Sequence, residues 1–234
     1  MLKEMKKKLH VAVALLSACC MLLAGCGASL TPADQNVNAL VELIVNDNAV
    51  PMKDLLGFAS EDDVRSSFIE DEANVDLVDS LAEEFTDLGI EFTDEELQEM
   101  SDSMSAMLKK VTYSTEITSE EKDKVTVTVK MNGFTEDQLS DSMLEIAESA
   151  TENISEEDLA LIASGDEEAS NAFVHQIFKD YMNAMAALEP TSEQSEITVE
   201  CEKLQLEVSG KNKIAWLPSD MTKFETDIEN CLFK

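Results

Sequence analysis

The stretch that decides the fold is Val111–Met131, VTYSTEITSEEKDKVTVTVKM. Apolar and polar side chains alternate in both of its halves, and the apolar set is Val111, Tyr113, Ile117, Val125, Val127, Val129 and Met131. Alternation at a period of two is typical of a strand with one buried face and one solvated face. The polar run Ser119–Asp123 lies between the halves as a turn. The stretch therefore predicts an antiparallel hairpin, which ends at Asn132-Gly133.

Helical patterns lie on both sides of this hairpin. Immediately before it, Thr93-Asp94-Glu95-Glu96 has the form of a capping box and starts an amphipathic helix. Apolar residues at helical spacing predict further helices at about 31–45, 51–56, 60–69 and 75–88, and then at about 135–150, 155–162, 167–188 and 219–232.

A second sheet region follows the longest of these helices. Its first strand places Ile197, Val199 and Cys201 on one face, whereas Leu204, Leu206 and Val208 have the opposite parity. A strand cannot exchange its faces without an extra residue, so we expect a β-bulge at Glu202-Lys203. A last strand carries Ile214 and Trp216. The sequence thus predicts an α+β fold, in which a curved antiparallel sheet of about four strands packs against several helices.

Two cysteines lie in this second half of the chain. Cys201 belongs to the core-facing set of its strand, and Cys231 belongs to the apolar set of the final helix. An even pair of cysteines in an oxidising compartment is consistent with a disulfide between them. Two buried free thiols are the alternative, and the sequence leaves both open.

The N-terminus has the order of a secretory signal. Basic residues within Lys3–Lys8 precede the apolar run Leu9–Leu23, and small residues then lead to a cysteine in Leu23-Ala24-Gly25-Cys26. This order resembles a bacterial lipoprotein signal, which implies removal of residues 1–25 and acylation of Cys26, with palmitate among the expected acyl groups. Leu16-Ser17-Ala18-Cys19 fits the same pattern and remains a rival, as does an uncleaved membrane helix. We expect residues 26–31 to be a lipidated tether and residues 32–234 to be a single acidic domain.

Charge and composition exclude several classes of protein. The net charge is −32, and loss of residues 1–25 would remove a net +3 and leave −35. Such a chain repels nucleic acid and anionic lipid. His175 would be the sole histidine of the mature chain, so a zinc site with several histidines cannot form. We expect no catalytic residues, no metal site and no cofactor.

The spans Thr93–Gly133 and Ile197–Trp216 resemble small, uncharacterised secreted lipoproteins of Gram-positive bacteria with a cystatin-like or NTF2-like domain. The resemblance implies a cone in which a curved antiparallel sheet holds helices in its concavity. This chain departs from the pattern by its additional helices between Thr135 and Leu188, which leaves open whether the cone holds a pocket or is filled by helices.

Three functions follow from these features. The first is a non-catalytic binding or accessory module, anchored through Cys26 to the extracytoplasmic face of the cell membrane, with an envelope protein or a small molecule as its partner. The second is an NTF2-like enzyme that uses a tyrosine, Tyr113 or Tyr181, and a buried carboxylate such as Asp180. The third is a solute-binding lipoprotein of a transporter. A deep pocket would favour the second, and an exposed apolar patch would favour a protein partner for the first.

Overall fold

The structure is a computed structural model that describes residues 30–69, 86 and 90–234. The predicted signal, Cys26 and the helix expected at 75–88 lie outside the described residues. In the part of the chain that is described, no helix is long and apolar enough to cross a membrane.

Four strands form one open antiparallel sheet in the order β1-β2-β3-β4. They are β1 (Tyr113–Glu120), β2 (Lys124–Asn132), β3 (Gln194–Val208) and β4 (Lys211–Pro218). The predicted hairpin is confirmed, because β1 pairs with β2 through Tyr113 opposite Met131 and Ile117 opposite Val127. All four apolar residues of β2 are at most 2% exposed, so the period-two pattern marks the buried face of the sheet.

Strand β3 exchanges its buried face without the β-bulge that we expected at Glu202-Lys203. Its register with β4 is continuous from Cys201 to Val208, and the irregularity of the sheet lies instead in β1, between Ile117 and Ser119. The exchange coincides with a change of neighbours, because β3 pairs with β2 only up to Glu202 and with β4 from Cys201 onward. A two-stranded ribbon twists more than the middle of a sheet, and this twist can turn the second half of β3 without an extra residue.

One layer of helices covers the buried face. Helix α2 (Ala33–Asn46) contacts β1, β2 and β4, so the sheet curves around it. Helices α3 (Val50–Leu56) and α4 (Glu61–Phe68) follow α2, and α10 (Met221–Leu232) contacts β2 and β3. Val37, Leu40 and Ile228 are fully buried in the resulting core. This sheet with α2, α3, α4 and α10 is called the body below.

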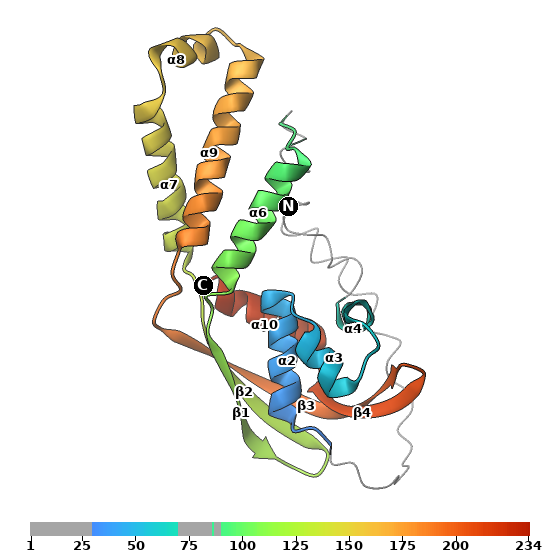
Figure 1. The fold of residues 1–234 in the computed structure, drawn as a ribbon. Helices are drawn as coiled ribbons and strands as arrows, with labels where there is room; N and C mark the ends of the chain where they lie inside the picture. Colours follow the sequence, from blue (N-terminus) through green and yellow to red (C-terminus); the bar gives the residue numbers. More distant parts are fainter. Residues whose placement is uncertain (1–29, 70–85, 87–89) are drawn as a thin grey trace.

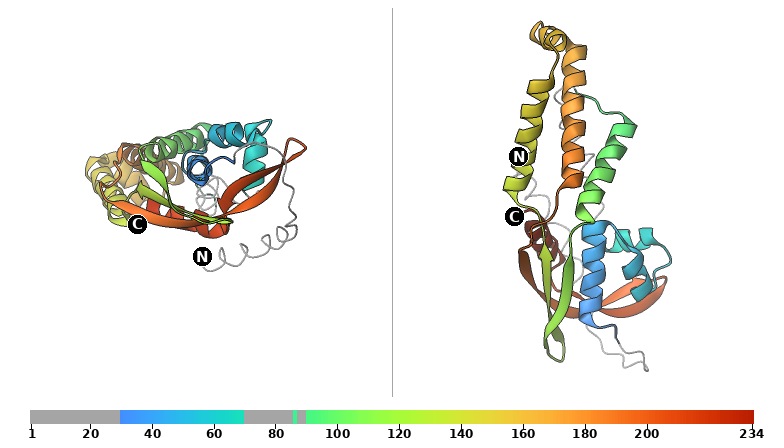
Figure 2. Two further views of the ribbon diagram at one scale, coloured as in Figure 1. Left: turned by 90° about the horizontal axis from the view of Figure 1, so that it is seen from below. Right: turned by 60° about the vertical axis from the view of Figure 1, so that its left-hand side comes forward.

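The remaining helices extend away from the body. They are α6 (Asp94–Leu108), α7 (Glu136–Asn153), α8 (Glu156–Ala163) and α9 (Glu167–Ala187). Helices α7 and α9 run side by side out of the body and are joined at their far end by α8, while α6 lies against α9 nearer the body (Figure 1). The same projection is visible in the right panel of Figure 2. The predicted α+β class is confirmed, but the additional helices project outward instead of filling a cone.

Candidate functional site: a projecting acidic arm

The arm, which we define as α7, α8 and α9, is built from three well-capped helices. Thr135 and Gln138 form a capping box at the start of α7, and Ser155 and Asp166 cap α8 and α9 through their side-chain oxygens. Gly165, between α8 and α9, has a φ of 82°, a backbone conformation that glycine adopts without strain. These local signals mark where the three helices begin and where the chain turns between α8 and α9.

Among the described helices, α9 is the main support of the other two helices of the arm. Helix α7 contacts α9 through half-buried residues such as Leu139, Ile146 and Ala150, and α8 also packs on α9. No residue of α7 or α8 is buried. Both helices nevertheless carry large apolar side chains in contact with solvent: Met143, Leu144, Leu159 and Leu161 are 46%, 58%, 54% and 41% exposed. Among the described residues, four of the seven exposed large apolar side chains therefore lie on these two helices.

The arm carries charge of one sign. Between Lys130 and Lys179 the chain has twelve aspartates and glutamates and neither lysine nor arginine. Leu144 illustrates the arrangement, since Asp141 lies three residues before it and Glu148 four residues after it, both on the same helical face. At the tip, Glu156 and Asp158 stand three residues before Leu159 and Leu161. The exposed apolar groups of the arm are thus surrounded by carboxylates.

The arm is fastened to α6 by a histidine–glutamate pair. His175 Nδ1 of α9 lies 2.8 Å from Glu96 Oε1 of α6, and the His175 ring packs on Phe92 with their centroids 4.9 Å apart. Glu96 also accepts from the backbone N–H of Thr93, at 2.8 Å, in the predicted capping box. The Thr93 hydrogen bond first, and the His175 hydrogen bond after it, hold the pKa of Glu96 below its usual value. The Glu96 carboxylate therefore caps α6 and also holds α9 against α6 through His175.

Charged contacts join the base of the arm to α6 and to Lys110, which follows α6. Lys110 Nζ donates to the Leu188 carbonyl at 2.9 Å and pairs with Glu189 at 2.8 Å. Lys179 pairs with Glu99 at 2.9 Å across the α6–α9 interface. A cavity of about 30 Å³ remains there, lined by Phe92, His175 and Phe178 among others, which is room for about one water molecule. The base of the arm is therefore packed, in contrast to its outer helices.

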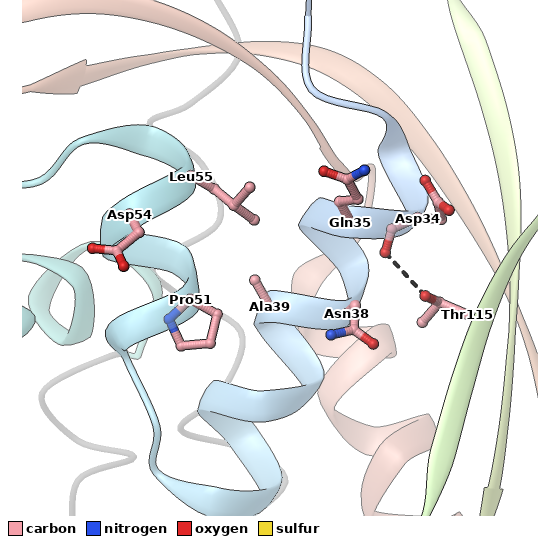
Figure 3. Close-up of a pocket in the computed structure, with 8 residues that line it drawn as sticks. All are labelled: Asp34, Gln35, Asn38, Ala39, Pro51, Asp54, Leu55 and Thr115. Atoms are coloured by element: carbon pink, nitrogen blue, oxygen red, sulfur yellow. Dashed lines mark hydrogen bonds between the residues drawn. The ribbon is translucent and has the colours of Figure 1, made fainter.

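A second hollow lies on the body, between α2 and α3 (Figure 3). This open groove has a volume of about 500 Å³ and is lined by Asp34, Gln35, Asn38, Ala39, Pro51, Asp54, Leu55 and Thr115. The Thr115 hydroxyl donates to the backbone carbonyl of Asp34 at 3.1 Å, so it is engaged in holding β1 against α2. Neither Tyr113 nor Tyr181 lines the groove.

The tyrosines that we considered for an enzyme lie elsewhere. Burial first, and the neighbouring Glu42 carboxylate second, raise the pKa of Tyr113 well above its usual value, so its hydroxyl keeps its proton at neutral pH. Burial also raises the pKa of Tyr181. Asp180 accepts a hydrogen bond from Gln176 of its own helix at 2.9 Å. The Tyr113 hydroxyl is therefore buried near Glu42 without a hydrogen bond to it, and Asp180, the carboxylate that the sequence suggested, bonds to Gln176 instead.

The two cysteines are both buried, as predicted, and both are free thiols. The Cys231 backbone lies against Gly133, just past the end of β2 where Met131 pairs with Ser195, whereas Cys201 lies six residues beyond Ser195 along β3. At about 3.3 Å per strand residue, that separation is roughly 20 Å, and a disulfide needs Cα atoms within about 7 Å. The structure does not bring the pair together. Burial raises the pKa of the Cys201 thiol to about 12, which keeps it protonated and unreactive.

The described residues contain no group of three or more histidine, cysteine, aspartate or glutamate side chains that could hold a metal ion. The arm itself was missed by the sequence reasoning, which predicted its helices but not their projection. Two signals could have pointed to it: the lack of basic residues over 131–178, and leucines such as Leu144 and Leu161 that fall outside the inward-facing sets.

Comparison with known proteins shows a fold and no family. No protein-family model matches the chain, and no curated protein matches it significantly. Among solved structures, the chain is similar to the crystal structure of ycdA, a proposed lipoprotein of Bacillus subtilis strain 168, with a TM-score of 0.53 at 14% sequence identity. The match covers 86% of this chain and 56% of that chain, so this chain spans little more than half the length of the other. The cystatin-like or NTF2-like assignment stays a prediction.

Proposed function

We propose that this protein is a membrane-anchored lipoprotein of the extracytoplasmic face, and that it acts as a non-catalytic binding or accessory module of the cell envelope. The observation that carries the proposal is the N-terminal signal, a basic segment and an uncharged apolar run that end in Leu23-Ala24-Gly25-Cys26. The fold shared with a protein proposed to be a lipoprotein supports it. Two acyl chains hold a protein stably on a bilayer, where a single chain is marginal.

The position of Cys26 in the chain indicates how the arm would be oriented relative to the membrane. Six residues separate Cys26 from the start of α2 at Ala33, so an anchor at Cys26 holds the body within about 25 Å of the bilayer. The described chain enters α2 at the end of the body that lies away from the arm (Figures 1 and 2). A lipid at Cys26 would therefore leave the arm pointing away from the membrane.

The surface features favour a binding role with a protein partner. The groove of Figure 3 is open and lined by neither tyrosine, whereas the arm exposes four large apolar side chains on α7 and α8, two helices with no fully buried residue. Exposed apolar groups concentrated in one region are typical of a surface that contacts another protein. No observation singles out a reaction, so the enzyme remains the weaker candidate.

The test is the membrane attachment of cysteine variants in the bacterial host. We expect the wild-type protein to partition into detergent and Cys26→Ala to be released from the membrane fraction. Cys19→Ala is the matched control, because Cys19 ends the rival Leu16-Ser17-Ala18-Cys19 pattern, and it should remain attached. If Cys19→Ala were released while Cys26→Ala stayed attached, the lipid would be carried by Cys19 and not by Cys26. Full attachment of both variants would overturn the proposal.

A further inference from the structure

We propose that the outer face of the arm, formed by α7 and α8, binds a basic amphipathic helix of a partner protein. This inference deepens the proposed binding role and rests on it, because the experiment below uses the lipid-anchored protein. It rests on three observations of the described residues: helices without buried residues, leucines exposed on them, and carboxylates around those leucines.

The first step is the incomplete burial of α7. Residues at helical spacing give α7 two sides, and Leu139 and Ile146 lie on the side that packs against α9. Leu144 lies nearly opposite to Ile146 around the helix, because two residues correspond to about 200° of rotation. It is the most exposed large apolar side chain among the described residues, at 58%. Leu144 thus faces away from α9, and no described element covers it.

The tip of the arm exposes two further leucines. Helix α8 has only eight residues, and an isolated helix of that length is not stable in water. Its two leucines at positions 159 and 161 are 54% and 41% exposed, although burial of leucine is the main source of helix stability in a folded chain. Leu159 and Leu161 lie about 200° apart around α8, so a helical partner could cover Leu144 together with one of them and supply burial that the arm itself lacks.

The negative charge of the arm indicates which kind of partner can bind to it. Twelve acidic residues and no basic residue lie between Lys130 and Lys179, and the carboxylates of Asp141, Glu148 and Asp158 flank the exposed leucines. A second copy of the arm would present the same negative charge and be repelled, and so would an anionic bilayer. A helix with leucines on one face and lysines or arginines along its borders satisfies both the apolar and the acidic parts of the surface. The complementary charge would also accelerate association.

The experiment measures binding of a defined probe to the full mature protein, held in nanodiscs of zwitterionic phosphatidylcholine. The probe is a synthetic helix of about 18 leucine and lysine residues with leucines on one face. A scrambled peptide of the same composition and empty nanodiscs are the controls. We expect the amphipathic probe to bind, with an affinity that falls as salt rises, and the scrambled peptide to bind at least about tenfold more weakly, a difference of about 1.4 kcal/mol.

Matched variants locate the surface. Leu144→Ser, Leu159→Ser and Leu161→Ser combined should weaken binding about tenfold or more, while Ile214→Ser, which alters an equally exposed side chain on β4, should change it less than about twofold. Asp141→Asn with Glu148→Gln should weaken binding and its salt dependence more than Glu116→Gln with Glu207→Gln, which removes two exposed charges from the sheet.

Four outcomes would overturn the inference. They are equal binding of the scrambled peptide, an unchanged affinity in the triple leucine variant, leucine-dependent self-association in analytical ultracentrifugation, and binding of the arm to anionic phosphatidylglycerol vesicles. Because membrane release of Cys26→Ala is measured separately in cells, loss of the anchor and loss of probe binding are distinguishable results.

Discussion

The body and the arm are both helical and acidic, yet they use their apolar residues in opposite ways. In the body, α2 contacts three strands and buries Val37, Leu40 and Val41 completely. In the arm, α7 is four residues longer than α2 but buries none of its residues, and its leucine at position 144 faces solvent. Apolar residues thus form the core of the body, whereas on α7 and α8 some of them remain available for contact. Helix length and capping alone do not distinguish the two regions.

This difference predicts how each region responds to the loss of a leucine. Leu40→Ala in α2 should lower the free energy of unfolding by about 4 kcal/mol, because a fully buried side chain leaves a cavity. Leu144→Ala in α7 should change it by less than about 0.5 kcal/mol. Urea denaturation followed by circular dichroism measures both. Comparable losses in the two variants would mean that α7 is covered to a degree that its 58% exposure does not show.

Two glycines sharpen the comparison at the level of the backbone. A Cβ atom on Gly133 would overlap the backbone carbonyl oxygens of Cys231 and Leu232, and backbone atoms cannot move aside as a side chain can. Gly133→Ala should therefore displace the end of α10 from β2 and destabilise the protein by about 2–3 kcal/mol.

Gly165 of the arm is the matched control for this glycine. A Cβ atom there meets no atom within 4 Å, so Gly165→Ala should cost only the strain of its positive φ, about 1 kcal/mol. Thermal unfolding of the two variants under one condition ranks them. A smaller effect at Gly133 than at Gly165 would contradict the packing of α10 described above.

The smallest expected effect concerns the fastening of the arm. The folded state lowers the pKa of Glu96, chiefly through the Thr93 backbone hydrogen bond, so the unfolded state binds its proton more readily. The resulting stability is complete above the unfolded pKa of about 4.3 and is lost as pH falls through the lower folded pKa. Glu96→Gln keeps a capping side chain but removes the charge. Because the Glu96 side chain is 35% exposed, solvent screening should limit its effect to below about 1 kcal/mol at neutral pH.

Free energies of unfolding measured between about pH 3 and pH 7 test this expectation. The difference between the wild type and Glu96→Gln should vanish at the acid end and grow as pH rises. A difference that is constant across the range would show that the carboxylate contributes through its shape and not through its charge.

Local rules in the sequence predicted the elements themselves. The alternation of Val125, Val127 and Val129 with threonines predicted β2 and its buried face, because a strand of any fold has a side-chain period of two. The Thr93–Glu96 capping box formed as predicted, since a cap involves only residues three positions apart. Helix α10 shows the limit of such signals, because its cap is Asp220 and not the Ser219 that the pattern favoured.

The candidate surface could be predicted only in part. The acidic run between Lys130 and Lys179 is visible in the sequence, and so are the leucines within it. The exposure of these leucines cannot be seen in the sequence, because an amphipathic pattern does not say which neighbouring element covers which face. The additional helices could equally have filled the concavity of the sheet, which α2 covers in the structure.

The sequence by itself determined the periodicities, most of the caps, the acidity and the pattern that predicts a signal before Cys26, because each depends on residues close together in the chain. The tertiary structure alone decided that the arm leaves the body, that β3 turns by twisting, and that Cys201 and Cys231 stand far apart. These features depend on which surfaces meet over long separations in sequence, and several arrangements of the same elements can bury the same apolar faces.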